Sequence, residues 1–454
     1  MRMSALAGLG ASGRFDPVAA LFLDGGKGAL LSSAVDLANY QTAAGVTLAG
    51  FGDPVGLALD TKNGVPAPAG PGAHFSQSVL ADRPTRGRQP RTGVQNLADQ
   101  AAQIGASPWI GASGGGETIT LNNRPDLSGA MRMTRIVSDG LANRGASLSV
   151  TVPNGIAGKT ITVAVDVYAE TEFTFAVRTR GEGATQEAVN STLTTVPGQT
   201  VRLHITRSFT GSADGSTFRL FLYTAAFNVN NANTIWFGRC QAEVGGSPTA
   251  FQDRVTINDI TEAGVPDVAH MRGNGVNQNS DGNDTARAIL RDAPGAEAHW
   301  AIIWEGGANA WLWFYSRNGG NEPRFALRIN ADGSLTAQVR RADGDATTTV
   351  STAAGAITEN VRTIVGLSVD YLGGGASAIT IWVNGVAVAT GELTGTGNTS
   401  DTLSDRVRIF SNAADTEYLK GFLLRELPLT ARLWTPFERN TVIPRMKALT
   451  GVSL

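Results

Sequence analysis

Residues 379–388 read ITIWVNGVAV, and this short stretch is the strongest local indication of the fold. Two apolar, strand-like runs flank the dipeptide Asn384-Gly385. A type I′ turn needs a positive φ at both of its central residues, and an Asn-Gly pair adopts these angles readily. The stretch therefore predicts a β-hairpin, in which a two-residue turn joins two antiparallel strands.

Strand-like runs of the same kind recur along most of the chain. In KTITVAVDVYAE, residues 159–170, the apolar residues alternate as in a strand with one buried face. The predicted buried face carries Ile161, Val163, Val165 and Val167. The opposite face, which would meet solvent or a ligand, carries Thr162, Ala164, Asp166 and Tyr168. Such short strands, separated by turn residues, are typical of antiparallel sandwiches.

The composition supports a β-rich protein and argues against two classes of partner. The 454 residues include 55 Gly and only 17% charged residues, which fits a turn-rich β protein. Lys and Arg number 37 against 39 Asp and Glu. This balance provides no basic footprint for nucleic acid and no polybasic arm for a membrane surface. No apolar run is long enough to span a bilayer, so we expect neither nucleic-acid binding nor membrane insertion.

The lone cysteine and the first residues bear on the compartment. Cys240 lies in an apolar, strand-like run, so we expect a buried, inert thiol. With one cysteine, no disulfide can form within the chain. The opening apolar stretch is short and is broken by Arg14 and Asp16, which makes it a poor secretion signal. We therefore expect the protein to fold in a cytoplasm.

We predict an all-β protein in three parts, because domains usually contain about 150 residues. Residues 1–91 form an N-terminal region that ends in a basic, proline-containing linker. Residues 92–256 and residues 257–454 each form an antiparallel β-sandwich, or jelly roll. The second sandwich ends in a short C-terminal helix, in which Pro436 fits the first turn. Pro444 is expected to interrupt the helical pattern.

Two of these parts resemble known families. Residues 368–393, SVDYLGGGASAITIWVNGVAVATGEL, and the closing KGFLLRELPLT resemble the laminin-G-like, concanavalin-like jelly roll. Residues 233–252, NTIWFGRCQAEVGGSPTAFQ, resemble the closing strand and exit of carbohydrate-binding-module-like sandwiches that are often appended to phage fibre proteins. The exit pattern Q-x-E-x-G-x-x-x-T-x-F is filled by Gln241, Glu243, Gly245, Thr249 and Phe251.

A third resemblance covers residues 45–84, which look like a segment that recurs in phage and prophage structural proteins, usually before a jelly roll. Its pattern is filled by Gly52, Asp53, Pro54, Val55, Gly56, Asp60, His74, Gln77, Arg83 and Pro84. A Pro/Gly-rich loop separates the two halves of the pattern in this chain. Residues 267–280 also depart from the aromatic-rich strand of that family, at Met271 and Gly273.

Together the three resemblances imply a virion fibre or spike protein of a phage or a gene transfer agent. The N-terminal region would attach to other virion proteins, and the sandwiches would bind host envelope polysaccharide for adsorption. Weak sugar sites gain from avidity, so we expect a homo-oligomer, most simply a trimer. Such a protein is assembled in the host cytoplasm and exposed on the released virion. The alternatives are a polysaccharide depolymerase and a purely structural spike or decoration protein without glycan binding.

The aromatic stretch 299–318, HWAIIWEGGANAWLWFYSRN, is the candidate glycan site. If Leu312 and Phe314 fill the core, strict alternation places Trp311, Trp313 and Tyr315 on the outer face of the strand. Three exposed aromatic side chains in a row would form a patch that needs a partner. The partner is either a sugar ring or a neighbouring subunit; otherwise these aromatic residues fill the core. The candidate glycan-binding residues are Trp304, Glu305, Asn309, Trp311, Trp313, Tyr315, Arg317 and Asn318.

The sequence offers little for a metal or for catalysis. The loop 277–284, NQNSDGND, is rich in oxygen ligands that calcium prefers, which makes Asp281 and Asp284 calcium candidates, although a plain turn explains the loop as well. No cofactor is otherwise expected. The histidines lack the spacing of a zinc site, no pair of carboxylates stands out for glycoside hydrolysis, and there is no nucleophile elbow or Walker loop. We therefore predict that the protein is not an enzyme.

Overall fold

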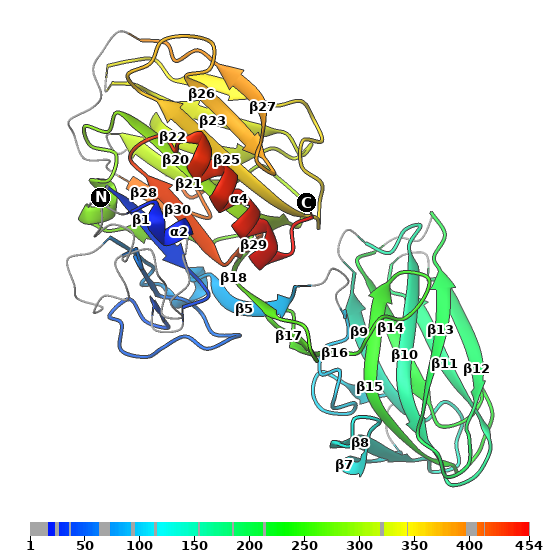
Figure 1. Ribbon diagram of the computed structural model, residues 1–454. Helices are drawn as coiled ribbons and strands as arrows, with labels where there is room; N and C mark the ends of the chain where they lie inside the picture. Colours follow the sequence, from blue (N-terminus) through cyan, green and yellow to red (C-terminus); the bar gives the residue numbers. More distant parts are fainter. Residues whose placement is uncertain are drawn as a thin grey trace. The chain divides into compact units, whose positions relative to one another are not determined.

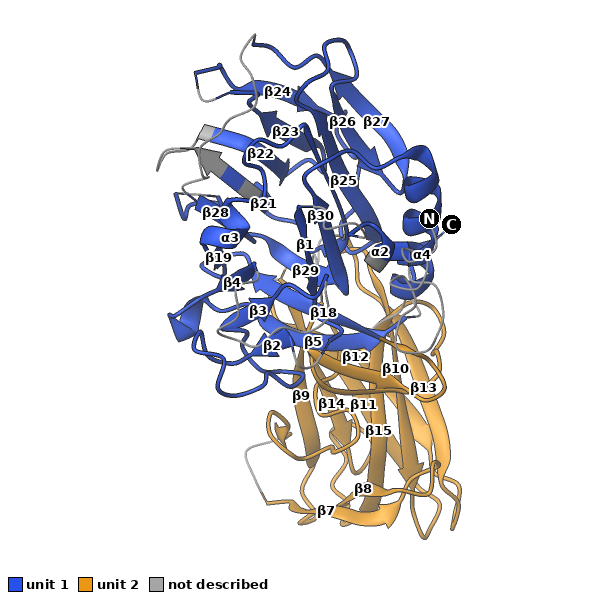
Figure 2. Ribbon diagram, turned by 60° about the vertical axis from the view of Figure 1, so that its left-hand side comes forward, with its two compact units in different colours: residues 1–91, 268–454 blue, residues 92–267 orange. Residues whose placement is uncertain are grey.

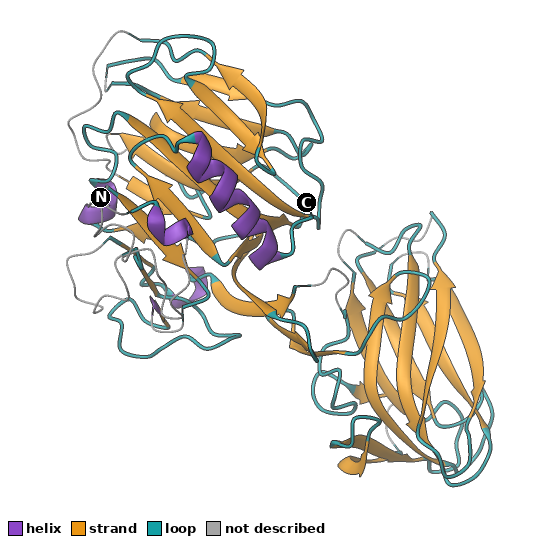
Figure 3. Ribbon diagram, viewed as in Figure 1, coloured by secondary structure: helices purple, strands orange, loops and turns teal. Residues whose placement is uncertain are grey.

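The structure is a computed structural model, shown as a ribbon in Figure 1. The part of the chain that it describes comprises residues 17–22, 27–35, 38–62, 73–91, 96–112, 116–152, 155–183, 186–211, 215–317, 322–342, 344–395, 406–412 and 414–453. The chain divides into two compact units (Figure 2), with residues 1–91 and 268–454 in unit 1 and residues 92–267 in unit 2. Strands form most of the regular structure in both units (Figure 3), which confirms the all-β fold class.

Unit 2 is, in its described residues, a sandwich of two five-stranded antiparallel sheets. The β10 sheet has the order β13-β10-β15-β8-β7, and the β14 sheet has the order β12-β11-β14-β9-β6. The strands are β6 (Ile110–Gly111), β7 (Thr118–Pro125), β8 (Met131–Val137), β9 (Gly145–Thr151), β10 (Thr160–Tyr168), β11 (Thr174–Gly181), β12 (Ala188–Thr194), β13 (Val201–Ser208), β14 (Thr217–Tyr223) and β15 (Thr234–Val244). A hairpin of β16 (Gln252–Thr256) and β17 (Asp259–Glu262) follows.

The core of unit 2 lies between its two sheets. The four alternate apolar residues of β10 all join this core, which confirms the predicted apolar face. The expectation that the opposite face meets solvent is wrong, because Thr162, Ala164, Asp166 and Tyr168 are 0–7% exposed, covered by neighbouring side chains. Phe175 and Phe237, from opposite sheets, meet edge to face with ring centroids 5.7 Å apart. Cys240 also lies in this core, and burial raises the pKa of its thiol to about 12. The thiol is therefore buried and protonated, as predicted.

Unit 1 is a second sandwich. Its β20 sheet runs β5-β18-β29-β20-β25-β26-β27, with β30 paired to both β20 and β1, and its β21 sheet runs β2-β3-β4-β19-β28-β21-β22-β23-β24. The N-terminal strands are β1 (Gly28–Ser32), β2 (Asn39–Tyr40), β3 (Leu57–Leu59), β4 (His74–Ser76) and β5 (Thr85–Pro90). The later strands are β18 (Asp267–Asn274), β19 (Ser280–Gly282), β20 (Gly295–Trp304), β21 (Ala310–Arg317), β22 (Glu322–Ile329), β23 (Leu335–Val339), β24 (Thr348–Ser351), β25 (Arg362–Asp370), β26 (Ile379–Val383), β27 (Val386–Gly391), β28 (Arg406–Ile409), β29 (Lys420–Leu424) and β30 (Glu426–Thr430). The helices are α2 (Pro17–Ala20), the 3₁₀ turn η3 (Leu80–Asp82), α3 (Asp284–Arg287) and α4 (Pro436–Thr450).

The N-terminal strands belong to the sheets of unit 1, which corrects the expectation of a separate region over residues 1–91. β1 pairs with β30, and β4 pairs with β19. The physical reason is size, because strands of two to six residues cannot bury a core alone and extend larger sheets instead. The boundary after residue 91 is where it was predicted. The second boundary lies at 267/268 rather than 256/257, because β16 and β17 belong to unit 2.

Residues of the pattern that resembles phage structural proteins hold this N-terminal part in place. Asp60 Oδ1 accepts a hydrogen bond from the Leu30 backbone N–H at 2.9 Å. Arg83 donates three hydrogen bonds to backbone carbonyl groups at 2.7–2.9 Å. Gln77 Nε2 donates to Asn279 Oδ1 at 2.6 Å. Asp60 and Arg83 therefore hold the N-terminal strands and loops to one another, and Gln77 ties them to the later part of unit 1.

The hairpin of the opening stretch is confirmed. Asn384 and Gly385 have φ of 52° and 82°, and they join β26 to β27 in the register Val383↔Val386. The Asn384 side chain also accepts a hydrogen bond from the Ile364 backbone N–H at 2.8 Å. The turn is therefore fixed by its own backbone angles and by a contact with the neighbouring strand β25.

Helix α4 packs on β20 and β25 (Figure 1) and is longer than predicted. It begins with a capping box between Thr435 and Glu438, an arrangement that satisfies two backbone N–H groups. The prediction that Pro444 interrupts the helix is wrong, because α4 continues through Pro444 to Thr450. Proline removes one hydrogen bond from a helix, and the packing of buried Val442, Ile443 and Met446 compensates for that loss.

A buried ion pair fastens α4 to the β20 sheet. Arg439 donates to both oxygens of Glu297, at 2.6 and 2.9 Å. Glu297 also accepts from the Trp434 backbone N–H at 2.8 Å and lies 2.9 Å from His299 Nε2. Burial alone would raise the pKa of Glu297, but the hydrogen bonds with His299 and Arg439 outweigh it and hold the pKa below its usual value. The carboxylate therefore stays ionised inside the sandwich.

His270 makes the stability of unit 1 depend on pH. Its side chain is fully buried on β18, edge-on to Phe422 at 4.7 Å. Burial, and then the charge of Arg272, lower its pKa to about 3, against about 6.5 in an unfolded chain. Between these pH values the unfolded chain binds a proton that the folded chain does not, so the free energy of unfolding falls as the pH falls. We expect His270→Phe to flatten this dependence between pH 6.5 and pH 4, as measured by urea denaturation. His204→Phe, at an exposed position of β13, serves as the control, and equal slopes for both variants would contradict the assignment.

Candidate functional site

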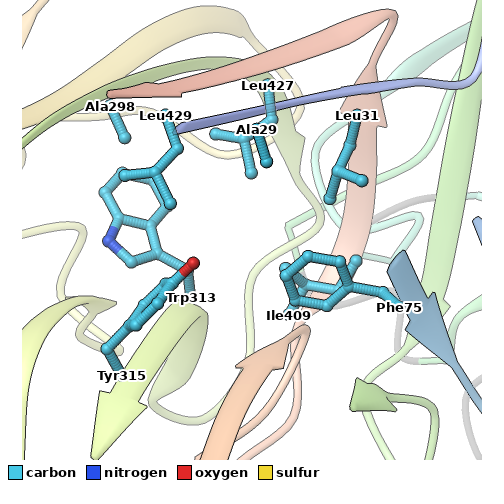
Figure 4. Close-up of a pocket in the computed structure, with 9 residues that line it drawn as sticks. All are labelled: Ala29, Leu31, Phe75, Ala298, Trp313, Tyr315, Ile409, Leu427 and Leu429. Atoms are coloured by element: carbon cyan, nitrogen blue, oxygen red, sulfur yellow. The ribbon is translucent and has the colours of Figure 1, made fainter. Parts of the chain in front are cut away.

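Three of the aromatic candidates from the 299–318 stretch fill the core of unit 1. The exposed fractions of Trp304, Trp313 and Tyr315 are 2%, 2% and 1%. Figure 4 shows Trp313 and Tyr315 beside a small apolar hollow between the two sheets. The hollow has a volume of about 10 Å³, which is no more than one water molecule requires. The sequence left open whether these residues contact a sugar, contact a subunit or fill the core. In the structure they fill the core.

A β-bulge explains why strict alternation misplaced these side chains. The register between β21 and β22 shifts between Trp311 and Trp313. Before the shift, Ala310 and Leu312 point into the core, and after it Trp313 and Tyr315 do so. One extra residue in a strand reverses which side chains face inward. Trp311 therefore lies on the face opposite to Trp313.

The remaining candidates of this stretch do not form one patch. The Trp311 indole donates to Glu417, and Arg328 lies over its ring, 5.6 Å from the centroid. Asn309 also reaches Glu417, at 3.5 Å, so the structure brings Trp311 and Asn309 together. Glu305 is instead paired with Arg272 at 3.0 Å. Arg317 is the last residue of β21, and Asn318 lies outside the described residues.

The calcium candidates are engaged by arginine side chains. Asp281 accepts from Arg408 at 2.5 Å, and Asp284 accepts from Arg287 at 2.9 Å. In the part of the chain that the structure describes, no group of three or more His, Cys, Asp and Glu side chains could hold a metal ion. The loop 277–284 instead contacts the N-terminal strands, because Asn283 lies 3.0 Å from His74.

An aromatic pair on the outer face of the β10 sheet is the feature best suited to a ligand. Tyr168 and Trp236, on neighbouring strands, meet edge to face with centroids 5.3 Å apart. With Met133 they form a cluster separate from the core of unit 2. Each aromatic side chain is 7% exposed. Arg124 covers the Tyr168 ring at 3.2 Å from its centroid, and Arg135 lies 5.6 Å from that of Trp236.

Polar groups surround this pair. The Trp236 Nε1–H donates to Asn123 Oδ1 at 2.8 Å. On the same face, Asp166 is fully buried and accepts from Arg202 at 2.8 Å and from Arg239 at 2.6 Å. A bulge in β15 at Arg239, whose φ is 40°, brings this guanidinium to Asp166. The face therefore combines aromatic rings with guanidinium and amide groups.

The exit pattern of unit 2 is a structural latch beside this face. Glu243 accepts from the Thr249 hydroxyl at 2.7 Å and from Gln241 Nε2 at 2.9 Å. Phe251 lies under Arg202 and Arg239, at 5.6 and 5.3 Å from their guanidinium carbons. The pattern residues thus fold the chain back onto β15.

Sequence reasoning placed Asp166 and Tyr168 on a face for solvent or ligand but missed Trp236 as their neighbour. The alternation of β10 was the available signal for the first two residues. The pairing Tyr168↔Trp236 joins strands that are far apart in the sequence, and no local pattern reveals it. The density of tryptophan in the 299–318 stretch drew attention to unit 1 instead.

Comparisons with known proteins concern only part of the chain. No protein-family model matches the sequence, and no curated protein matches it. Among solved structures, the chain is similar to the C-terminal family 22 carbohydrate binding module of Clostridium thermocellum Xyn10B, with 16% identity, a TM-score of 0.27, and coverage of 33% of this chain and 94% of that chain. It is also similar to the CBM22-1 xylan-binding domain of Paenibacillus barcinonensis Xyn10C, with 13% identity, a TM-score of 0.27, and coverage of 35% and 99%. A third is the Ruminococcus gnavus IT-sialidase CBM40, with 16% identity, a TM-score of 0.31, and coverage of 39% and 96%. Similarity at this level transfers no binding property to this chain.

Among the described residues, no helix is both long and apolar enough to cross a membrane.

Proposed function

We propose that the chain is a virion fibre or spike protein of a phage or gene transfer agent that binds host envelope polysaccharide on the outer face of the β10 sheet. The observation that carries the binding proposal is the Tyr168–Trp236 pair, which lies outside the core of unit 2. Sugar rings have an apolar C–H face that packs on aromatic rings, while their hydroxyl groups need hydrogen-bonding partners. On this face, Tyr168 and Trp236 supply the aromatic rings, and neighbouring arginine and asparagine side chains supply the hydrogen-bonding groups.

The arginines over the rings mark where the sugar would lie. The guanidinium group of Arg124 occupies the position over Tyr168 that a sugar ring would take. Both Arg124 and Arg135 are partly exposed, and their long side chains can swing aside at little cost. Their N–H groups would then donate to sugar hydroxyls. The rings stay protected from water in the free protein and become available to a ligand.

Binding without cleavage fits the carboxylates on this face. Glycoside hydrolysis requires an acid and a second carboxylate on either side of the bond. Asp166 is held by two arginines, and Glu243 is held by the exit latch. Neither carboxylate is free to protonate a leaving group. We propose that the protein is not an enzyme.

The virion role rests on the resemblance of residues 45–84 and of the exit pattern to phage structural proteins. The N-terminal segment would contact other virion proteins, and a homo-trimer would present several sugar sites at once. Linked weak sites bind polymers through effective concentration. The protein would be assembled in the host cytoplasm and displayed on the released particle.

Gel filtration of envelope polysaccharide from candidate hosts, with and without the purified protein, tests this function. Co-elution with unchanged polymer length is the expected result. Shortened polymer would make the protein a depolymerase, and no shift with any host would leave a structural spike.

Loss of the aromatic pair should abolish most of the binding. We expect Tyr168→Ala/Trp236→Ala to weaken polysaccharide retention in affinity electrophoresis by about tenfold or more, since each tenfold corresponds to about 1.4 kcal/mol. Trp236→Phe keeps an aromatic ring but loses the hydrogen bond to Asn123. This variant should bind the polysaccharide with an intermediate affinity. Trp311→Ala in unit 1 is the control and should bind normally. Equal retention of the double variant, with folding verified by its thermal transition, would refute the site.

A further inference from the structure

The outer face of the β14 sheet, on the other side of unit 2, carries a second aromatic cluster. Phe221 and Tyr223 are two residues apart on β14, with ring planes 21° apart and centroids separated by 5.6 Å. Phe227 follows, 5.8 Å from Tyr223. With Ala176, Phe221 and Tyr223 form a cluster apart from the core between the sheets. The Phe221 and Tyr223 rings are nearly parallel and are 5% and 3% exposed, whereas the Phe227 ring is tilted by 40° to that of Tyr223. Together they form an apolar floor beneath the surface side chains.

Three arginines surround this floor. Arg178 lies opposite Phe221 in the register of β11 and β14, and Arg180 lies opposite Arg219. Their guanidinium carbons are 5.5–5.9 Å from the Phe221 centroid. Arg178 is also 4.7 Å from the ring of Phe227. Positive charge is therefore concentrated around one aromatic side chain.

This charge is poorly balanced within the protein. Arg219 lies 3.5 Å from Glu182. Across the residues that the structure describes, neither Arg178 nor Arg180 has an ion pair with a carboxylate. The Nε atoms of Arg178 and Arg180 are buried, and neither has a hydrogen-bond acceptor in the described part of the chain. Buried donors without acceptors and adjacent like charges both cost free energy, and an anion at this position would relieve both.

We propose that this face is a second binding site, which takes an acidic sugar of a polysaccharide. The acid group, a carboxylate or a phosphate, would lie between Arg178 and Arg180, and the sugar ring would lie on Phe221. A guanidinium presents parallel N–H groups that match either acid group, and such charge-assisted bonds are short and strong. Asn190, which is exposed and lies opposite Arg178 on β12, would serve the sugar hydroxyls.

The acidic-sugar site is independent of the β10-sheet site, because the two use opposite faces of one sandwich. Affinity electrophoresis of the full chain can separate them with defined polymers. Polygalacturonate supplies carboxylates on sugar rings, phosphorylated dextran supplies phosphates on sugar rings, and unmodified dextran is neutral. Double-stranded DNA is the polyanion without a suitable sugar acid.

We expect the native protein to be retarded by at least one of the two acidic polymers, and the one that retards it more identifies the acid group. Arg178→Gln/Arg180→Gln should weaken that retention by about tenfold or more. Arg291→Gln/Arg445→Gln removes the same two charges from exposed positions of unit 1 and should retain native behaviour. Tyr168→Ala/Trp236→Ala should also keep its retention by the acidic polymer, so failure of the β10-sheet site leaves this result intact.

Three outcomes would overturn the proposal. One is no retention by either acidic polymer. Another is an equal loss of retention in Arg178→Gln/Arg180→Gln and in Arg291→Gln/Arg445→Gln, which would show an effect of net charge. The third is equal retention by DNA, which would show a non-specific polyanion surface. Phe221→Leu, which keeps an apolar side chain at the same position but removes the ring, provides a second variant whose retention should fall while folding is preserved.

Discussion

Trp313→Ala is expected to lower the free energy of unfolding by about 3–5 kcal/mol, the range for deleting a large aromatic side chain from a core. The indole is 2% exposed and stacks on Phe325 with centroids 5.9 Å apart. It also lines the hollow between the two sheets, so its removal enlarges an existing void instead of letting the core collapse. Urea denaturation followed by fluorescence measures the loss, with the other tryptophans of unit 1 as reporters.

The same variant separates the two interpretations of the 299–318 stretch. Under conditions in which it stays folded, Trp313→Ala should bind polysaccharide as the native protein does. Trp311→Ala is the matched comparison, because Trp311 lies on the other face of β21 and, among the described residues, shares its small apolar cluster with Ala326. Its loss of stability should be smaller. Unchanged stability together with lost binding for Trp313→Ala would show that this side chain contacts the ligand, contrary to the structure.

Glu297→Ala should destabilise unit 1 by a similar amount, about 3–5 kcal/mol. The substitution leaves Arg439 and His299 without their shared acceptor in a site where Glu297 itself is fully buried. An unpaired buried charge costs far more than the pair contributes. Because Arg439 lies on α4, we also expect the helix to become sensitive to limited proteolysis before the rest of the chain.

Two further variants distinguish a buried charge from a general effect of losing an acid. Asp284→Asn breaks an exposed ion pair, in which the aspartate side chain is 84% exposed, and should cost less than about 1 kcal/mol. Glu297→Leu/Arg439→Leu removes both charges and should recover part of the lost stability, because apolar replacements of buried pairs are often tolerated. A double variant as unstable as Glu297→Ala would indicate that packing, and not charge, explains the loss.

Local sequence signals predicted the features that depend on neighbouring residues. The Asn384-Gly385 turn, the core face of β10 and the inert Cys240 thiol all follow from short-range rules about backbone angles, alternation and burial. The all-β fold class follows from many such runs together.

Features that depend on distant parts of the chain were not predictable in this way. The bulge between Trp311 and Trp313 is a property of the pairing with β22, and it reversed the faces on which the glycan hypothesis for unit 1 rested. The Tyr168–Trp236 pair likewise exists only through the pairing of β10 with β15. The uninterrupted helix at Pro444 depends on tertiary packing that outweighs local preference.

The pairing of β1 with β30 has a consequence for synthesis on the ribosome. The Ser33 hydroxyl donates a hydrogen bond to the Arg425 carbonyl, although the two residues are 392 positions apart in the sequence. Unit 2 is one continuous stretch between the two halves of unit 1. Unit 2 can therefore complete its folding while the second half of unit 1 has not yet been translated. Until β30 emerges, β1 lacks the strand with which it pairs and exposes an open sheet edge, which is prone to pair with other chains. A cell that makes many copies at once thus faces its highest risk of aggregation late in elongation, when most of each chain already exists.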